Sequence, residues 1–224
     1  MDTHSFKLAS LILAASLLGF AGRAAAEPRP SVNVVLHVCD DPDIHWNLVS
    51  RAKDEMGRIF RDAGIDIAWT DQDSMSTGPD DPPPASSVPQ LTLVILCRDL
   101  TEELTVDETA LGGAVGTRDY RGHVAYVFYD RVERYARTSL NVSRDPETDD
   151  LYSVILLAHT MAHEVGHLLL PYGHSATGLM RAEWDAKDMR LAVEQRLNFT
   201  PEQAEVIRGR IVARAGDTRS PASN

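Results

Sequence analysis

Residues 158–180 read AHTMAHEVGHLLLPYGHSATGLM and contain half of the eight histidines in the chain. The first part of this stretch is largely apolar between its histidines, whereas Pro171 and Gly173 interrupt the second part. Proline cannot continue a helix, and glycine permits a tight turn. The stretch therefore predicts a long helix over residues 149–170, followed by a turn that carries His174.

Residues 163–167 read HEVGH, which fits the pattern HExxH. Positions four apart on a helix face the same way, so His163 and His167 can present their imidazoles to one metal ion. Glu164 follows the first of them and can take a proton from a metal-activated water. His174 is the candidate third ligand, since a catalytic zinc site uses three protein ligands and leaves one position open. We predict a single catalytic Zn²⁺, because neutral imidazoles suit zinc.

The longer stretch HEVGHLLLPYGHSATGLM resembles the metzincin clan of zinc metallopeptidases, whose pattern is HExxHxxGxxH followed by a turn that contains methionine. By position, Met180 matches the turn methionine, and the resemblance implies that it forms an apolar floor under the metal. The spacing diverges, because Leu170 stands at the glycine of the pattern, the third histidine comes one residue late and the methionine comes early. The ligands and the general base are matched by four residues: His163, His167, His174 and Glu164.

An acidic third ligand on a later helix, as in the gluzincin group, is the alternative to His174, and three residues are candidates: Glu183, Asp185 and Asp188. We prefer His174 as the third ligand, because an imidazole on a short turn after the helix needs less of the remaining fold to be in place than a carboxylate on a later helix. His159 lies one turn before His163, and we expect it to be packed or to support a ligand rather than to bind the metal.

The motif and the resemblance predict a zinc metallopeptidase that acts on peptide or protein substrates, with Glu164 as the general base. Two alternatives use the same residues, namely a non-proteolytic zinc-binding module and a zinc amidohydrolase that acts on a non-peptide amide. An intact Glu164 favours an enzyme, because a purely structural zinc site needs no base and tends to close its fourth position.

Apolar runs that are β-branched or alternating predict five strands, over residues 31–38, 65–70, 90–98, 111–117 and 123–129. The run 111–117 is rich in glycine and suits an edge strand or a loop beside one. Apolar residues at helical spacing predict a helix over 45–63, which makes the first two strands a parallel pair joined by a right-handed crossover. Residues 137–148 are mostly polar and are expected to form a loop. Two further helices are predicted over 184–196 and about 200–213.

These elements predict an α/β (α+β) fold. The resemblance to the metzincin clan implies that this fold is zincin-like. We expect a mixed, mostly parallel, twisted sheet with an antiparallel edge strand, a long active-site helix and a small helical C-terminal subdomain. The predicted catalytic domain covers residues 27–214, with subdomains at about 31–170 and 171–214. Residues 215–224 are expected to form a flexible tail.

The first 26 residues have a lysine before an apolar core and end in Ala-x-Ala, which is typical of a cleaved signal peptide. We therefore expect a secreted or periplasmic protein without a transmembrane segment. Export makes a disulfide between Cys39 and Cys97 feasible, and two buried free thiols are the alternative. The formal net charge of −11 argues against nucleic acid as a partner. A monomer is expected.

Overall fold

The computed structural model describes residues 29–39, 44–70, 88–97, 107, 109–115, 123–139, 146–171 and 173–217. The predicted signal peptide over residues 1–26 lies outside the described residues, as does the part of the predicted tail that follows Asp217.

The described residues contain five strands, which in chain order are β1 (Ser31–Val38), β2 (Asp66–Thr70), β3 (Gln90–Leu96), β4 (Gly112–Val115) and β5 (Val124–Phe128). Across the sheet their order is β2-β1-β3-β5-β4. β1 is parallel to β2 and β3, and β3 is parallel to β5, whereas β4 is antiparallel to β5. The predicted fold class is confirmed, because this is a mixed, mostly parallel sheet that ends in an antiparallel edge strand.

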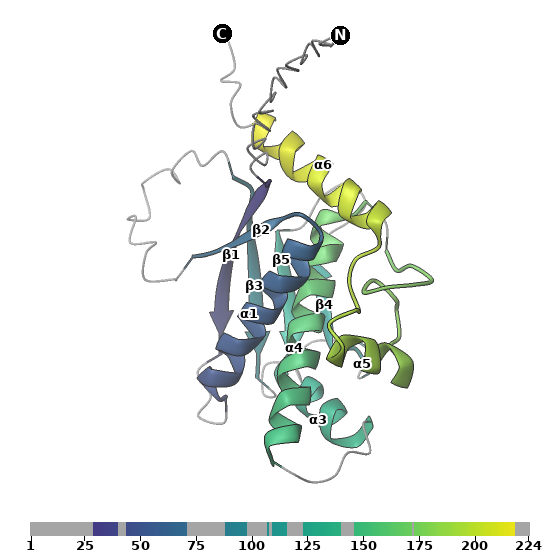
Figure 1. Cartoon of the computed structure of the whole chain (residues 1–224). Helices are drawn as coiled ribbons and strands as arrows, with labels where there is room; N and C mark the ends of the chain where they lie inside the picture. The colour runs from purple at the N-terminus through teal and green to yellow at the C-terminus, as the bar shows by residue number, and fades with distance from the viewer. Residues whose placement is uncertain are drawn as a thin grey trace, which may run out of the picture.

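The same residues contain five helices, namely α1 (Trp46–Asp62), α3 (Tyr129–Ser139), α4 (Pro146–Leu169), α5 (Ala186–Val193) and α6 (Pro201–Asp217). α1 forms the crossover between β1 and β2, and it lies beside α4 over one face of the sheet (Figure 1). α6 meets the end of α4, where Arg210 and Arg214 donate hydrogen bonds to the carbonyls of Leu169 and Leu168 at 3.2 Å each. The site helix α4 is therefore held along its length and at its end.

The expected loop over residues 137–148 is wrong at both ends, because α3 continues to Ser139 and α4 begins at Pro146. α3 is mostly polar, but its buried residues Tyr129, Val132 and Ala136 follow one another at intervals of three and four positions, on one face of the helix. Its polar face carries ion pairs between successive turns, such as Arg134 with Asp130 at 3.0 Å. Such pairs support a helix that has only a narrow apolar stripe.

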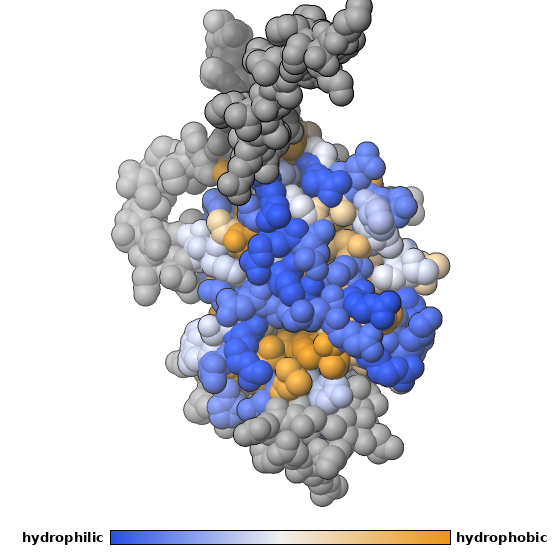
Figure 2. Space-filling model, viewed as in Figure 1, coloured by the Kyte–Doolittle hydropathy of each residue, from blue (hydrophilic) through white to orange (hydrophobic). Residues whose placement is uncertain are grey.

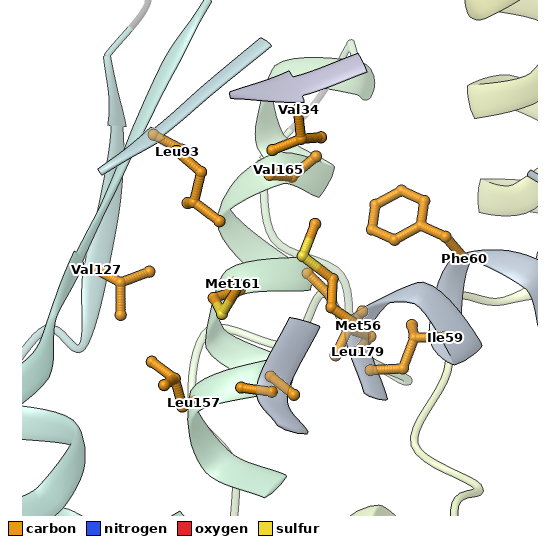
Figure 3. Close-up of a cluster of buried hydrophobic side chains, with 14 of the residues drawn as sticks. Val34, Met56, Ile59, Phe60, Leu93, Val127, Leu157, Met161, Val165 and Leu179 are labelled. Carbon is orange, nitrogen blue, oxygen red and sulfur yellow. The ribbon is translucent and has the colours of Figure 1, made fainter. Parts of the chain in front are cut away.

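α4 is the central element of the core, since every side chain from Ser153 to Gly166 is buried. A helix that is apolar on almost all sides is buried on almost all sides. Burying each large apolar side chain contributes about 1.5–3 kcal/mol relative to exposure. Figure 3 shows side chains of α4 meeting those of the sheet and of α1, among them Leu157, Met161 and Val165 of α4, Val34, Leu93 and Val127 of the sheet, and Met56, Ile59 and Phe60 of α1.

Hydrophilic side chains cover most of the face seen in Figure 2, which is the face over α1, and a hydrophobic patch interrupts them. This hydrophilic surface agrees with the amphipathic pattern of α1, which buries its other face through residues that include Val49, Met56 and Phe60. Among the described residues, no helix combines the length and the apolar character that crossing a membrane requires.

Cys39 and Cys97 form a disulfide, with their Cα atoms 5.9 Å apart. Cys39 follows β1 and Cys97 follows β3, and these two strands are direct neighbours in the sheet. Because parallel strands end at the same edge of a sheet, the two side chains can meet there. The bond therefore joins the carboxyl ends of two central strands.

Candidate metal centre

Three histidines meet at one point of the structure. His163 and His167 project from the same side of α4, and His174 comes from the turn that follows the helix. One ring nitrogen from each lies within 4.8 Å of the other two, and the Nε2 atoms of His163 and His167 are 3.0 Å apart. Within the described ranges, this is the one group of three or more histidine, cysteine or acidic side chains close enough to share a metal ion.

The spacing and the chemistry of this group fit zinc. Tetrahedral zinc with bonds of about 2.0–2.1 Å to nitrogen places two ligand nitrogens about 3.3 Å apart. The observed separations, from 3.0 Å to at most 4.8 Å, bracket that value. Small changes in side-chain torsions can therefore bring all three nitrogens onto one ion. Three imidazoles without a thiolate form the donor set of a catalytic rather than a structural zinc site.

The orientation of His163 is fixed by a hydrogen bond outside the three-histidine group. Its Nδ1 donates to the carbonyl oxygen of Leu179 at 2.8 Å. A ring that donates from Nδ1 carries its lone pair on Nε2, which is the nitrogen that faces His167. Such a partner sets both the tautomer and the angle of a metal-binding ring. His163 is thus held ready to bind through Nε2.

Burial keeps the histidines of α4 neutral. The pKa of His163 is lowered to about 4, chiefly by burial and also by the nearby His174, although the hydrogen bond to Leu179 acts in the opposite direction. The pKa of His167 is also lowered to about 4, first by burial and then by its two histidine neighbours. Because only the neutral imidazole can bind a metal ion, both rings are available as ligands at neutral pH.

Glu164 is buried in the wall of the same site, with 7% of its surface exposed. Burial raises the pKa of its carboxyl to about 8. β4 passes directly over it, because a Cβ on Gly112 would lie 2.7 Å from Cγ of Glu164 and 2.8 Å from its Oε1. The absence of a side chain at Gly112 therefore leaves the room that the carboxyl occupies. A general base with a pKa near the operating pH works most efficiently.

Met180 is completely buried against α4. A Cβ on Gly166 would lie 2.6 Å from its sulfur and 2.9 Å from the ring of Phe199. The glycine inside HEVGH thus lets both side chains approach the helix between the turns that carry His163 and His167. Met180 therefore packs against α4 between these two turns, and its role as the turn methionine that the resemblance implies stays a prediction.

The turn that returns His174 to the helix is closed on itself and tied to α6. The backbone N–H of Ser175 donates to the carbonyl of Met180 at 2.8 Å. Gly178 has a φ of 74°, a left-handed conformation that favours glycine. Gln203 of α6 donates from Nε2 to the hydroxyl of Ser175 at 3.1 Å. These bonds fix Ser175, the residue that follows His174, through its backbone and through its side chain.

None of the acidic alternatives joins the three histidines in the part of the chain that the structure describes. Asp185 caps α5 by accepting from the backbone N–H groups of Lys187 and Asp188. Asp188 is buried and forms an ion pair with Arg181. Glu183 is exposed and lines the cleft described below. Two of the three carboxylates therefore already have structural partners.

His159 lies in the interior, one turn before His163, and is not part of the three-histidine group. Its Nδ1 is 2.7 Å from the carbonyl oxygen of Ile155. Its ring is perpendicular to that of Trp184, with 6.3 Å between their centroids. Burial lowers its pKa. His159 therefore packs behind the ligands.

The site opens into a cleft of about 1360 Å³. Glu164 and the three histidines line it, the edge strand β4 forms one wall, and the segment after α4 contributes Pro171, Gly173 and residues 181–184. Tyr135 of α3 and Arg210 of α6 also line the cleft. A concave site with a few converging polar groups is the usual form of a substrate site, and this cleft is larger than the range of about 300–1,000 Å³ that is typical of small-molecule pockets.

Arg131 of α3 holds the rim of this cleft and is not among the residues that the sequence patterns indicate. Its guanidinium donates to the carbonyls of Asp107 at 2.7 Å and Ala110 at 3.0 Å. It also lies 4.5 Å from the centroid of the Phe128 ring. No pattern in a single sequence indicates contacts between residues this far apart along the chain. Arg131 fixes the segment that leads into β4.

Replacing Gly112 by alanine is expected to lower kcat/KM for the peptide hydrolysis proposed below by up to about 10²-fold, because displacement of a catalytic group can cost that much. The new Cβ would meet Glu164 and also the backbone carbonyl of Tyr126, at 2.7 Å. Gly113→Ala is the matched control, since a Cβ there has nothing within 4 Å. Steady-state kinetics and thermal unfolding of both variants make the comparison. Equal activity of the two variants would show that β4 does not hold Glu164.

The fold and the site together define an α/β protein with a three-histidine centre beside an edge strand. No family model and no curated protein matches the chain. Among solved structures it is similar to the crystal structure of archaemetzincin from Methanopyrus kandleri, with a TM-score of 0.42 and 14% identity over 84% of this chain and 98% of that one. At this identity and TM-score, the likeness does not assign an activity to the chain.

Proposed function

We propose that the protein is a zinc-dependent peptidase. The observation that carries the proposal is the convergence of His163, His167 and His174 on one point, with the buried carboxyl of Glu164 beside it, in the wall of an open cleft. A structural zinc site is normally closed by a fourth protein ligand and needs no neighbouring base. This arrangement has three ligands and a base, which favours catalysis over a structural or purely binding role.

The three histidines would hold the zinc ion through ring nitrogens, with Nε2 of His163 directed by its bond to Leu179. When bound, zinc supplies Lewis-acid chemistry by lowering the pKa of water and polarising a carbonyl. Glu164 accepts the proton of the attacking water and later delivers it to the leaving amine. Its buried position beside Gly112 keeps the carboxyl in place for both transfers.

β4 offers a place for an extended substrate. It is the last strand in the sheet order, so one of its edges pairs with β5 and the other faces away from the sheet. Leu111, Gly112, Gly113 and Ala114 line the cleft along this strand. A peptide in extended conformation can add to such an edge by main-chain hydrogen bonds. This favours a peptide substrate over a small non-peptide amide.

Removal of the metal is expected to abolish peptide cleavage, and zinc is expected to restore it. The test incubates the protein that lacks residues 1–26, in zinc-loaded, chelator-treated and zinc-restored forms, with a diverse peptide library and identifies the products by mass spectrometry. Cleavage in the first and third forms only would support the proposal and would report the sequence preference. Equal product in all three forms, or no product from the zinc-loaded form, would contradict it.

Export and a monomeric state belong to this proposal, and export rests on the sequence of residues 1–26. The location is tested by expressing the whole chain in a bacterial host and determining the N-terminus of the protein recovered outside the cytoplasm. Cleavage after Ala26 is the expected result.

A further inference from the structure

Trp184 contacts the metal centre in two ways. Its indole Nε1 donates a hydrogen bond to the carbonyl oxygen of Leu179 at 3.1 Å, and the same oxygen accepts from Nδ1 of His163 at 2.8 Å. Its ring also stands perpendicular to the ring of His163, with 5.6 Å between the centroids. A tryptophan that lies four residues after Met180 therefore supports a histidine from another element.

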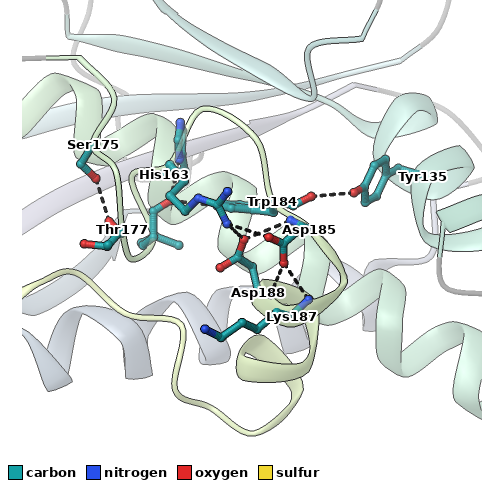
Figure 4. A network of polar contacts seen from close by, with 10 residues as sticks. Tyr135, His163, Ser175, Thr177, Trp184, Asp185, Lys187 and Asp188 are labelled. Atoms are coloured by element: carbon teal, nitrogen blue, oxygen red, sulfur yellow. Dashed lines mark hydrogen bonds and ion pairs between the residues drawn. The ribbon is translucent and has the colours of Figure 1, made fainter.

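Trp184 is also held in this position by groups that do not belong to the three-histidine group. The hydroxyl of Tyr135 in α3 donates to the Trp184 carbonyl at 3.1 Å. The following residue, Asp185, caps α5, and both Asp185 and Asp188 form ion pairs with Arg181. Figure 4 shows these contacts on either side of Trp184. These contacts hold the backbone on both sides of the indole.

The shared carbonyl explains how Trp184 can act on His163. A carbonyl oxygen has two lone pairs, and here His163 and Trp184 each donate to this oxygen. With both donors present, the carbonyl of Leu179 cannot turn without losing a hydrogen bond. The partner of Nδ1 sets the angle at which a histidine ring presents Nε2 to a metal ion. Loss of the indole N–H would release the carbonyl and loosen that angle.

We propose that Trp184 is a positioning residue that fixes the Leu179 carbonyl, and through it the imidazole of His163, for a metal ion held by the three histidines. The role rests on the proposed metal centre but not on peptide hydrolysis, so it can be tested by metal binding alone. Trp184 also becomes an internal reporter, since its indole lies next to a candidate ligand. The other two tryptophans lie elsewhere, because Trp46 is 67% exposed at the start of α1 and Trp69 belongs to β2, at the end of the sheet opposite to β4.

The test titrates the metal-free protein with Co²⁺ and follows both the visible absorption of the bound ion and the tryptophan emission. Trp184→Phe keeps an aromatic ring but removes the N–H donor. We expect it to bind Co²⁺ about tenfold more weakly, at the lower end of the effect of losing a partner of a metal ligand, and with a changed absorption spectrum. Emission should respond to the metal in the wild type and in Trp46→Phe, but not in Trp184→Phe.

Tyr135→Phe is the second variant, because it removes only the hydrogen bond to the Trp184 carbonyl. We expect a weaker loss of Co²⁺ affinity in the same direction. A purely structural tryptophan would lower the unfolding temperature of Trp184→Phe but leave its Co²⁺ affinity and spectrum unchanged, and that result would overturn the role. If Trp184→Phe does not fold, wild-type affinity and spectrum in Tyr135→Phe overturn it. A wild type that binds no Co²⁺ would instead overturn the metal centre itself.

Discussion

Glu164→Gln is expected to lower the rate of peptide hydrolysis by about 10²- to 10⁴-fold, the range that general acid–base catalysis usually contributes. Glutamine has the shape of glutamate, so the close packing against Gly112 is preserved. It cannot accept a proton from the attacking water or return one to the leaving amine. The measurement is kcat/KM of both proteins on a peptide that the library identifies.

The same substitution is expected to leave zinc binding and folding intact, because Glu164 is not among the three ligands. Burial disfavours the charged form of this carboxyl, so the neutral amide should be tolerated at least as well. Zinc content by mass spectrometry and the unfolding temperature are the controls. A glutamine variant with wild-type zinc content and wild-type activity would show that another group is the base.

His174→Ala is expected to weaken zinc binding by more than about 100-fold, since loss of a partner that only supports a ligand already costs about 10- to 100-fold. Two imidazoles on α4 would remain, which is one fewer than a catalytic zinc site uses. The dissociation constant is measured by competition with a chromogenic chelator. Activity in excess zinc should fall with the fraction of loaded protein.

Glu183→Ala is the matched control for that substitution. Glu183 is exposed in the same cleft and was the remaining acidic candidate for the third ligand. Removing it should leave the zinc dissociation constant within the error of the wild type. The opposite pattern, with full zinc occupancy in His174→Ala and loss in Glu183→Ala, would move the third ligand to the acidic residue.

Much of the fold could be predicted from local patterns. β1, β3 and β5 are rich in apolar and β-branched residues, and their buried positions largely alternate along each strand, which is the pattern of a strand with one face on the core. α1 has regular helical spacing and ends just before Gly64, whose φ of 76° is left-handed. α3 could not be predicted as readily, because its apolar stripe is narrow and ion pairs between its turns contribute to its stability. Its contacts with α4 decide its place.

The sequence by itself determined the candidate ligand pair and the candidate base, because a helix of fixed pitch places His163, Glu164 and His167 within little more than one turn. It also indicated His174, because proline and glycine end a helix by local chemistry. Only the tertiary structure decided that β4 closes over Glu164 at Gly112, that Arg131 fixes the cleft rim and that Trp184 and His163 share one carbonyl. These contacts join residues from different elements, and backbone periodicity carries no information about which elements will meet.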